Sequence, residues 1–157
     1  MQIVKAQLSH FETVKQITHN TISEIYPLYY ANGVVDFFLD HHNDDNIRKD
    51  ILAGNVFLLF DGQKAVGTVT IRKNEICRLF VLPAYQHKGF GRELLEFAEN
   101  QLAQAYTEIE LDSSLPAKHI YLERGYIPIE AHQIVSENGD VLSYDLMRKT
   151  CVKTSEY

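Results

Sequence analysis

The sequence predicts a single α/β (α+β) domain in which helices flank a central mixed, mostly antiparallel sheet. Its 157 residues are the length of one domain. Three apolar segments follow one another at residues 55–60, 65–71 and 75–82, separated by short polar turns, which is typical of an antiparallel meander. A long amphipathic helix then leads to another strand, and a strand reached through a helical crossover is expected to lie parallel to the one before it.

The N-terminal third is predicted to be a strand followed by helices. Residues 3–7 favour a short strand, and Ser9 is a predicted N-cap for a helix that continues to about Ile25. A second helical pattern covers residues 33–53, and the polar run 41–46 is expected to divide it into two helices. The three strands of the meander come next.

The C-terminal half is predicted to return to the sheet after the long helix. That helix covers residues 90–105, with its apolar side chains on one stripe, and residues 107–111 form the following strand. A short helix comes next and ends at Gly125, because glycine commonly terminates helices. Two closing strands are expected at residues 126–129 and 141–147.

The composition is typical of a globular protein of the cell interior. A net charge of −6 argues against a nucleic-acid-binding surface, because phosphate contacts need an excess of Lys and Arg. No apolar run approaches the 18 residues of a membrane helix. We therefore expect a cytoplasmic protein with no membrane or nucleic-acid partner, one domain at residues 1–150 and a frayed tail at residues 151–157.

Two kinds of metal or thiol site are not supported by the sequence. Cys77 and Cys151 have neither disulfide nor zinc spacing. Cys77 carries no sequence signature of a nucleophile, so we interpret it as a small buried side chain. His41 and His42 are adjacent, but no second cluster has ligand spacing. No metal site is predicted.

The most informative stretch is residues 75–95, which has the pattern of a strand, a basic glycine-containing loop and a helix. The start of a helix presents unpaired backbone N–H groups and the positive end of the helix dipole. Lys88 and Arg92 add side-chain charge at the same point. The stretch therefore predicts a binding site for an anion, and phosphate is the expected group.

Two common phosphate motifs are absent from this stretch. A P-loop requires Gly-Lys followed by Ser or Thr, whereas Lys88 is followed by Gly89 and Phe90. The dinucleotide fingerprint requires a third glycine at the position that Leu94 holds. These spacings, and the antiparallel meander before the loop, disfavour a generic nucleotide-binding α/β protein.

The segment Gln86-His-Lys-Gly-Phe-Gly resembles the pyrophosphate loop of the GNAT family of acetyl-coenzyme A-dependent N-acetyltransferases, whose pattern is Gln/Arg-x-x-Gly-x-Gly/Ala. The predicted order of elements resembles the GNAT fold along nearly the whole chain. Three further features resemble the family: the helical segment Ala117 to Tyr126, the carboxylate of Glu75 fourteen residues before Gly89, and the polar strand end Leu111-Asp-Ser-Ser.

The resemblance implies acetyl-coenzyme A as the cofactor. In this family the central strand pairs with the pantetheine arm and the loop holds the pyrophosphate. The residues implied to contact coenzyme A are Leu79, Phe80, Val81, Gln86, His87, Lys88, Gly89, Phe90, Gly91, Arg92, Ser113 and Ala117. The resemblance also implies that a backbone N–H of the central strand, here that of Val81, donates to the charge that develops on the thioester oxygen.

Two catalytic residues are implied by the same resemblance. Glu75 is the candidate base that removes a proton from the acceptor ammonium, which requires a site that raises its pKa; an ordinary solvated strand residue is the alternative. Tyr121 is the candidate acid that donates a proton to the thiolate of coenzyme A. An aromatic core residue is the alternative for Tyr121, since its helix is apolar on both sides of it.

The acceptor region is implied to lie near the first helices. The candidate residues are Tyr26, Tyr29, Tyr30, Asp36 and Phe37, which would suit a cationic amine, although the apolar stripe around Phe37 also fits a core. The predicted function is transfer of an acetyl group to a primary amine of a small molecule or peptide in a ternary complex. The alternative is an acyl-coenzyme A-binding sensor or interaction module without turnover. A homodimer through the strand at residues 141–147 is possible on sequence grounds.

Overall fold

A seven-stranded mixed sheet forms the centre of the computed structural model, which describes residues 1–151. The strand order is β1-β2-β3-β4-β5-β7-β6, and each neighbouring pair is antiparallel except β4 with β5. The strands are β1 (Gln2–Lys5), β2 (Val56–Asp61), β3 (Lys64–Arg72), β4 (Glu75–Val81), β5 (Glu108–Ser113), β6 (Ile127–Val135) and β7 (Val141–Thr150). The helices are α1 (Phe11–Ile25), α2 (Asn32–His41), α3 (Asp44–Leu52), α4 (Phe90–Ala103) and α5 (Lys118–Glu123).

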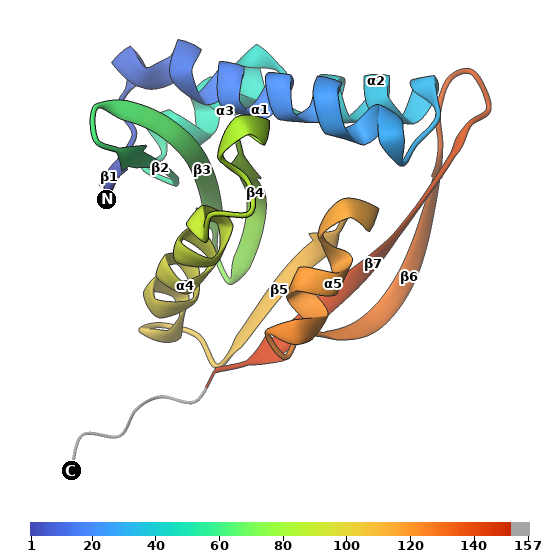
Figure 1. Ribbon diagram of the computed structural model, residues 1–157. Coiled ribbons are helices and arrows are strands. Elements are labelled where there is room, and N and C mark those ends of the chain that lie inside the picture. The colour runs from blue at the N-terminus through green and yellow to red at the C-terminus, as the bar shows by residue number, and fades with distance from the viewer. Residues whose placement is uncertain (152–157) are drawn as a thin grey trace.

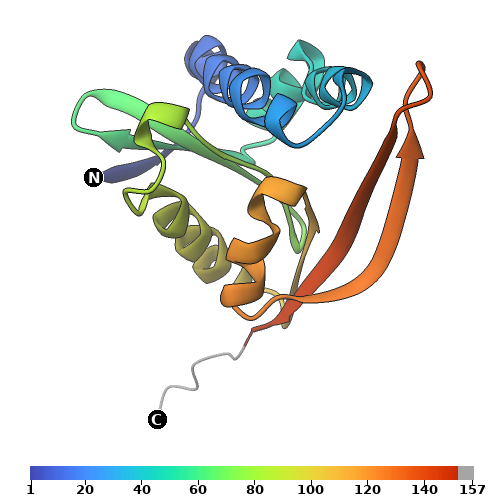
Figure 2. The same cartoon turned by 45° about the vertical axis from the view of Figure 1, so that its right-hand side comes forward.

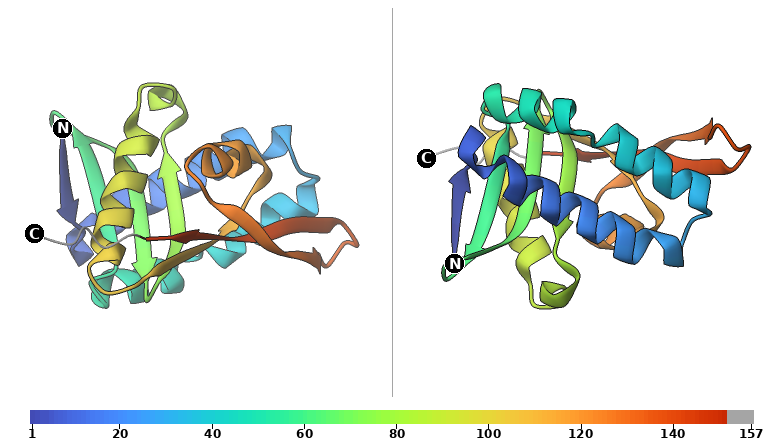
Figure 3. Two further views of the ribbon diagram at one scale, coloured as in Figure 1. Left: turned by 90° about the horizontal axis from the view of Figure 1, so that it is seen from below. Right: turned by 90° about the horizontal axis from the view of Figure 1, so that it is seen from above.

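Helices cover both faces of the sheet. Figure 1 and the two views of Figure 3 show α1, α2 and α3 on one face and α4 and α5 on the other. Each face has its own hydrophobic core. Gly67 of β3 allows α4 to pack closely, because a Cβ at this position would lie only 2.7 Å from Cδ1 of Leu94. Within residues 1–151, no helix is long and apolar enough to cross a membrane.

Most of the predicted order of elements is confirmed, including the meander and the parallel strand after the long helix. The division of the second helical pattern is also confirmed. It occurs at Asn43, whose side chain accepts a hydrogen bond from the Asn46 amide at 2.9 Å and thereby starts α3.

The predicted N-cap of the first helix is wrong. Residues Leu8–His10 form a 3-10 turn that contains Ser9, and α1 begins only at Phe11. The amide of Gln7 donates to Nδ1 of His10 at 3.0 Å, so a histidine three residues ahead satisfies the amide that precedes the turn. A serine hydroxyl is not needed at this helix start.

The two closing strands extend several residues beyond the predicted ranges 126–129 and 141–147. β6 is the last strand of the sheet, and its apolar residues Ile127, Ile129 and Val135 are exposed. A strand that is solvated in this way lacks the buried alternation that identifies strands in a sequence. Backbone pairing with β7 along its whole length forms β6 instead.

The carboxyl end of β7 is tied back to the sheet. The amide of Cys151 donates to the carbonyl of Thr107 at 2.7 Å, directly after β7 ends. Residues 152–157, which make up the rest of the predicted tail, lie outside the described residues. The expectation that they fray therefore stays a prediction.

β4 and β5 separate after a short parallel contact. Only Glu75 with Glu110 and Ile76 with Leu111 are paired between them. Figures 1 and 2 show β4 continuing on one side while β5 runs toward the β6–β7 hairpin. Among the described residues, one edge of β4 therefore has no neighbouring strand over residues 77–81.

A β-bulge at Cys77 sets which side chains of β4 face each layer of helices. Cys77 has no partner in β3, because Ile76 and Arg78 pair with successive residues of that strand. The extra residue reverses the alternation of side chains. Ile76 thus lies in the core on the α4 face, while Phe80 lies in the core on the α1 face. By the same alternation Glu75 lies on the α1 face.

The tip of the β6–β7 hairpin reaches α2. The backbone N–H of Gly33, in the first turn of α2, donates to Oδ2 of Asp140 at 2.9 Å. A carboxylate at a helix N-terminus satisfies an unpaired amide and interacts favourably with the helix dipole. This contact fixes the far end of a hairpin that otherwise extends away from the body of the protein, as Figure 2 shows.

A buried carboxylate connects α4 to the C-terminal strands. Glu99 of α4 is 8% exposed and accepts hydrogen bonds from Nε of Arg124, the hydroxyl of Tyr126 (both 3.0 Å) and Nζ of Lys149 (2.8 Å). Burial raises the pKa of Glu99, but the hydrogen bonds from Arg124 and Lys149 outweigh it and hold the pKa below its ordinary value. Glu99 therefore stays charged and holds three donors together.

Replacement of Glu99 by Gln is expected to lower the free energy of unfolding by about 2 kcal/mol, because hydrogen bonds to a charged group are lost. Since the folded-state pKa of Glu99 is lowered, the stability it contributes is present above the unfolded pKa of about 4.3 and is lost as the pH falls through the folded value. Urea denaturation from pH 7 to pH 3 measures this difference, which should narrow only below about pH 4. Glu96→Gln, at an exposed position of the same helix, is the control and should lie close to wild type. Equal stabilities for Glu99→Gln and wild type at pH 7 would contradict the assignment.

Candidate active site

A cavity of about 360 Å³ lies where β4 and β5 separate. Its walls come from β4, the end of β5, α1, α2, the start of α5 and the β6–β7 hairpin. The cavity brings together twelve residues predicted from the sequence: Tyr26, Phe37, Glu75, Leu79, Phe80, Val81, Gln86, His87, Gly91, Ser113, Ala117 and Tyr121.

Seven other predicted residues do not line the cavity. Gly89 and Phe90 form the start of α4, where Phe90 is buried in the core. Tyr30 packs against the hydrophobic core on the α1 face of the sheet. Its hydroxyl accepts a hydrogen bond from the Leu115 amide at 2.7 Å. Five members of this set are exposed: Tyr29, Asp36, Lys88, Gly89 and Arg92.

The free edge of β4 presents the backbone of Leu79 and Val81. The amide of Leu82 donates to the carbonyl of Val66 in β3 at 2.8 Å. Because bonding directions alternate along an antiparallel strand, the amides of Leu79 and Val81 point away from β3. On that side the carbonyl of Val81 accepts from Nε2 of Gln86 at 3.0 Å. An extended ligand can add to this edge as a further strand.

The loop between β4 and α4 ends in a set of backbone amides. Gly89 is the N-cap of α4 and has φ +88°, a conformation that favours glycine, and His87 has φ +62°. The first hydrogen bond of the helix runs from the Glu93 amide to the Gly89 carbonyl at 3.1 Å. The amides of residues 90–92 precede it and lie at the positive end of the helix dipole. This geometry suits an anion such as pyrophosphate.

Glu75 is a half-buried carboxylate in the two-residue paired stretch of β4 and β5, one residue before the strands separate, and it lines the cavity. Burial raises the pKa of Glu75, the negative charge of Asp112 raises it further, and Arg72 lowers it in part. A raised pKa makes a carboxylate a better proton acceptor near neutral pH than an exposed one. The environment that the base hypothesis requires is therefore present around Glu75.

Tyr121 lies on α5 with its side chain only 7% exposed, and it also lines the cavity. Burial raises the pKa of Tyr121 to about 12, so its hydroxyl is protonated at neutral pH. Its ring packs edge-on against Tyr126 with centroids 5.7 Å apart. Gly125, with φ +92°, ends α5, and the amide of Tyr126 donates to the Tyr121 carbonyl at 3.0 Å. The residue is thus both a core aromatic and a cavity-lining phenol.

Several cavity residues were not predicted as site residues from the sequence, although orienting the substrate and capping the following turn are both open roles for Asp112 on sequence grounds. Arg72, Asp112 and Tyr144 join Phe37 and His41 at the end of the cavity near Glu75. Burial raises the pKa of Asp112, and a second carboxylate lies near the first. The sequence feature that could have identified Arg72 is the two-residue turn before β4. Once the register of the β3–β4 hairpin is known, this turn places Arg72 opposite Glu75.

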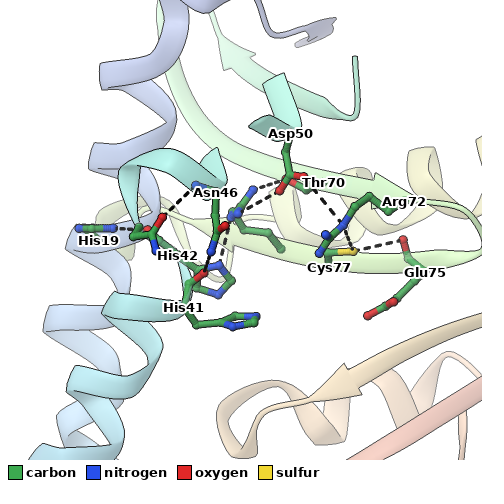
Figure 4. A network of polar contacts seen from close by, with 11 residues as sticks. His19, His41, His42, Asn46, Asp50, Thr70, Arg72, Glu75 and Cys77 are labelled. Atoms are coloured by element: carbon green, nitrogen blue, oxygen red, sulfur yellow. Dashed lines mark hydrogen bonds and ion pairs between the residues drawn. The ribbon is translucent and has the colours of Figure 1, made fainter. Parts of the chain in front are cut away.

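A buried ion pair joins Arg78, which lines the cavity, to Asp50 of α3, and Figure 4 shows Asp50, Thr70 and His42 in the polar network around it. Nη2 of Arg78 donates to Oδ2 of Asp50 at 3.3 Å, Nη1 to the Thr70 hydroxyl at 2.8 Å and Nε to Nδ1 of His42 at 3.2 Å. Burial and the neighbouring Arg78 lower the pKa of His42 to about 2, so the ring is neutral and can accept. Within residues 1–151, no group of three or more His, Cys, Asp or Glu side chains is placed to hold a metal ion.

Solved structures of the same fold include several acetyltransferases. The GCN5-related N-acetyltransferase from Rhodopseudomonas palustris has a TM-score of 0.85 at 18% identity, over 95% of this chain and 94% of that one. The PaiA N-acetyltransferase from Thermoplasma acidophilum, in complex with coenzyme A, has 0.75 at 18% identity, over 95% and 98%. YncA from Salmonella typhimurium, with its cofactor acetyl-CoA, has 0.73 at 13% identity, over 99% and 96%. At these identities the likeness shows the fold.

The family is shown by the sequence itself. A family model described as an acetyltransferase (GNAT) domain matches residues 25–144, which is more than half of the chain. The matched range contains Glu75, the loop before α4 and Tyr121. The chain therefore belongs to the GNAT acetyltransferase domain family.

Proposed function

We propose that this protein transfers the acetyl group of acetyl-coenzyme A directly to a primary amine of a small molecule or peptide, in a ternary complex. One observation carries the proposal: the free edge of β4 and the amides at the start of α4 meet one cavity that also contains Glu75 and Tyr121. Family membership supports it, as do the similar structures that hold coenzyme A or acetyl-CoA.

The residues of the cavity fit coenzyme A at both ends. Backbone N–H groups from His87 to Arg92 would hold the pyrophosphate, and the edge of β4 at Leu79 and Val81 would hold the pantetheine arm. Ser113 and Ala117 line the opposite wall, on the side of β5 and α5. Bound acetyl-coenzyme A supplies the thioester that carries the acetyl group.

The geometry favours Leu79 over Val81 as donor to the thioester oxygen. The Val81 carbonyl is bonded to Gln86 of the pyrophosphate loop, so Val81 lies at the pyrophosphate end of the edge. Leu79 is two residues, about 7 Å, further along the strand. Because the pantetheine arm separates pyrophosphate from thioester, the Leu79 amide is the better placed to stabilise developing negative charge.

Glu75 would remove the proton from the acceptor. A typical alkylammonium has a pKa of about 10.4, so nearly all of it is protonated at pH 7 and must lose a proton before it attacks. Glu75 lies on the α1 face of the sheet, which is the face that α2 and its aromatic residues cover. The protonated hydroxyl of Tyr121 would donate to the departing sulfur from the wall that α5 forms.

Replacement of Gly91 by Val is expected to weaken coenzyme A binding by about tenfold or more, because a branched side chain would occupy the pyrophosphate end of the cavity. The fold should tolerate the change, since a Cβ at Gly91 meets only Cγ2 of Val81, at 3.8 Å. Isothermal titration calorimetry with coenzyme A measures the effect, and unchanged thermal unfolding without ligand is the control. An unchanged affinity in the folded variant would contradict the placement of the pyrophosphate.

Replacement of Glu75 by Gln is expected to lower kcat by about 100-fold or more while coenzyme A affinity stays the same. The pKa of Glu75 is raised, so the wild-type rate should fall as the pH drops through a value above the ordinary 4.3 or so of Glu. That acidic limb should be absent from the variant. Thiol release as a function of pH measures both effects, with Glu108→Gln at an exposed position of β5 as the control. Full turnover of Glu75→Gln at every pH would remove Glu75 from the mechanism.

Replacement of Tyr121 by Phe is expected to slow thiol release by about 100-fold, with coenzyme A affinity and thermal stability close to wild type. Tyr126→Phe is a matched control. Its hydroxyl is bonded to Glu99 rather than directed into the cavity, so this variant should lose stability and keep its turnover. If Tyr121→Phe loses stability instead of turnover, Tyr121 is a core residue only. Thiol release also separates the enzyme from an acyl-coenzyme A sensor, which would bind the coenzyme without turnover.

A further inference from the structure

Arg72 is a cationic side chain placed directly beside the candidate base. It is the last residue of β3 and the register partner of Glu75 across the β3–β4 turn. Partners across an antiparallel ladder have Cα atoms about 5 Å apart and side chains on the same face. The side chain of Arg72 is half exposed and lines the same cavity as Glu75.

Among residues 1–151, the contacts of the Arg72 guanidinium are made through one nitrogen, Nε. Its Nε donates to Sγ of Cys77 at 3.3 Å and lies 3.9 Å from Oδ1 of Asp50, as Figure 4 shows. Asp50 is itself fixed, because its other oxygen accepts from the buried Arg78. Within residues 1–151, neither Nη group of Arg72 has an acceptor, and the guanidinium forms no ion pair with Glu75. The two free Nη groups form a fork that matches a planar anion.

The surroundings of Arg72 have opposite charges on its two sides. A polar cavity of about 100 Å³, lined by Lys49, Asp50 and Arg78, adjoins the main cavity there and carries more positive than negative charge. On the other side lie the carboxylates of Glu75 and Asp112. A ligand with a negative and a positive group close together therefore matches this end of the cavity.

Building on the proposed acetyltransferase function, we propose that the acceptor is a zwitterionic amine of the α-amino-acid class. Its carboxylate binds the Nη groups of Arg72, and its ammonium faces Glu75 and Asp112. Both groups of an α-amino acid are attached to one carbon, which suits two partners that are opposite each other on adjacent strands. A dianionic phosphate fits less well, because Glu75 and Asp112 would repel it.

The rest of this end of the cavity is apolar and aromatic. Phe37 and Phe38 of α2, and Leu142 and Tyr144 of β7, line it. These side chains suit an apolar or aromatic substituent on the α-carbon. Phenylalanine, leucine and methionine are therefore the first acceptors to test, each with its α-amide as a ligand of the same shape that lacks the carboxylate.

The test compares each amino acid with its amide in two assays. Thiol release with acetyl-coenzyme A gives kcat and KM, and calorimetry in the presence of coenzyme A gives the acceptor Kd without turnover. For wild type we expect a Kd and a KM about 10- to 100-fold lower for at least one amino acid than for its amide, since a charge-assisted hydrogen-bonded pair is lost with the amide.

Variants then assign this preference to Arg72. Arg72→Gln should raise the Kd and KM of the amino acid to those of the amide, leave the amide values unchanged and leave coenzyme A affinity at the wild-type level. Lys73→Gln is the matched control, because it removes the same charge from the neighbouring turn residue, which does not line the cavity. Lys73→Gln should keep the preference for the amino acid.

The outcomes separate the acceptor class from the proposed function. Thiol release from amides or simple amines that equals release from amino acids, with no effect of Arg72→Gln, would overturn the zwitterion and leave the acetyltransferase in place. A preference for phosphorylated amines would also overturn it. Absence of both coenzyme A binding and thiol release with every amine would overturn the proposed function together with the acceptor class that depends on it.

Discussion

The two-residue contact between β4 and β5 is the constraint on which the rest of this molecule depends. A parallel pair that continued to the end of β4 would satisfy every backbone group and leave no room for a ligand. Separation after Ile76 leaves polar backbone groups on the β4 edge, and buried groups of this kind need partners. The helix start beside the same edge adds further unpaired amides. Strand separation thus creates a site whose unpaired backbone groups, along the β4 edge and at the start of α4, can form hydrogen bonds with a ligand.

Two buried polar networks hold the separated strands in place. On the β4 side, Arg78 and Asp50 tie the strand to α3, and on the β5 side, Glu99 ties α4 to Arg124 and Lys149. Arg78 and Asp50 are both buried, and removing one partner of such a pair typically costs about 3–5 kcal/mol, because the other charge is left without compensation. These contacts oppose movement of β4 relative to α3 and of α4 relative to the C-terminal strands.

The strand–loop–helix at residues 75–95 could be predicted from the sequence because its signals are local. Glycine at a helix start, an apolar strand and a proline-broken turn each act within a few residues. The prediction of Ser9 as the N-cap was wrong because the side chain that accepts from the Gln7 amide is that of His10, an uncommon partner for this role. The length of β6 was underestimated because its apolar side chains are exposed and show no buried alternation in the sequence. Its extent is set by backbone pairing with β7.

The candidate site was predictable only in part for the same reason. Glu75 and Tyr121 lie in segments that resemble family motifs, whereas Arg72 was visible only as a polar turn residue. The orientation of the Arg72 side chain depends on Asp50 of α3 and on the β-bulge at Cys77, which no local sequence pattern predicts. Contacts between distant segments set the direction of a side chain, and those contacts are a property of the fold.

The hydrogen bond between Gly33 and Asp140 joins residues that are 107 positions apart in the chain. It links α2 to the hairpin, and both of these elements line the cavity. Closing a loop of this length costs entropy that only the finished fold can offset. The proposed acceptor end of the cavity is therefore complete only when the last hairpin lies against the first helices. The strands β1 to β4 alone, which end at Val81, lack the hairpin that lines part of this cavity.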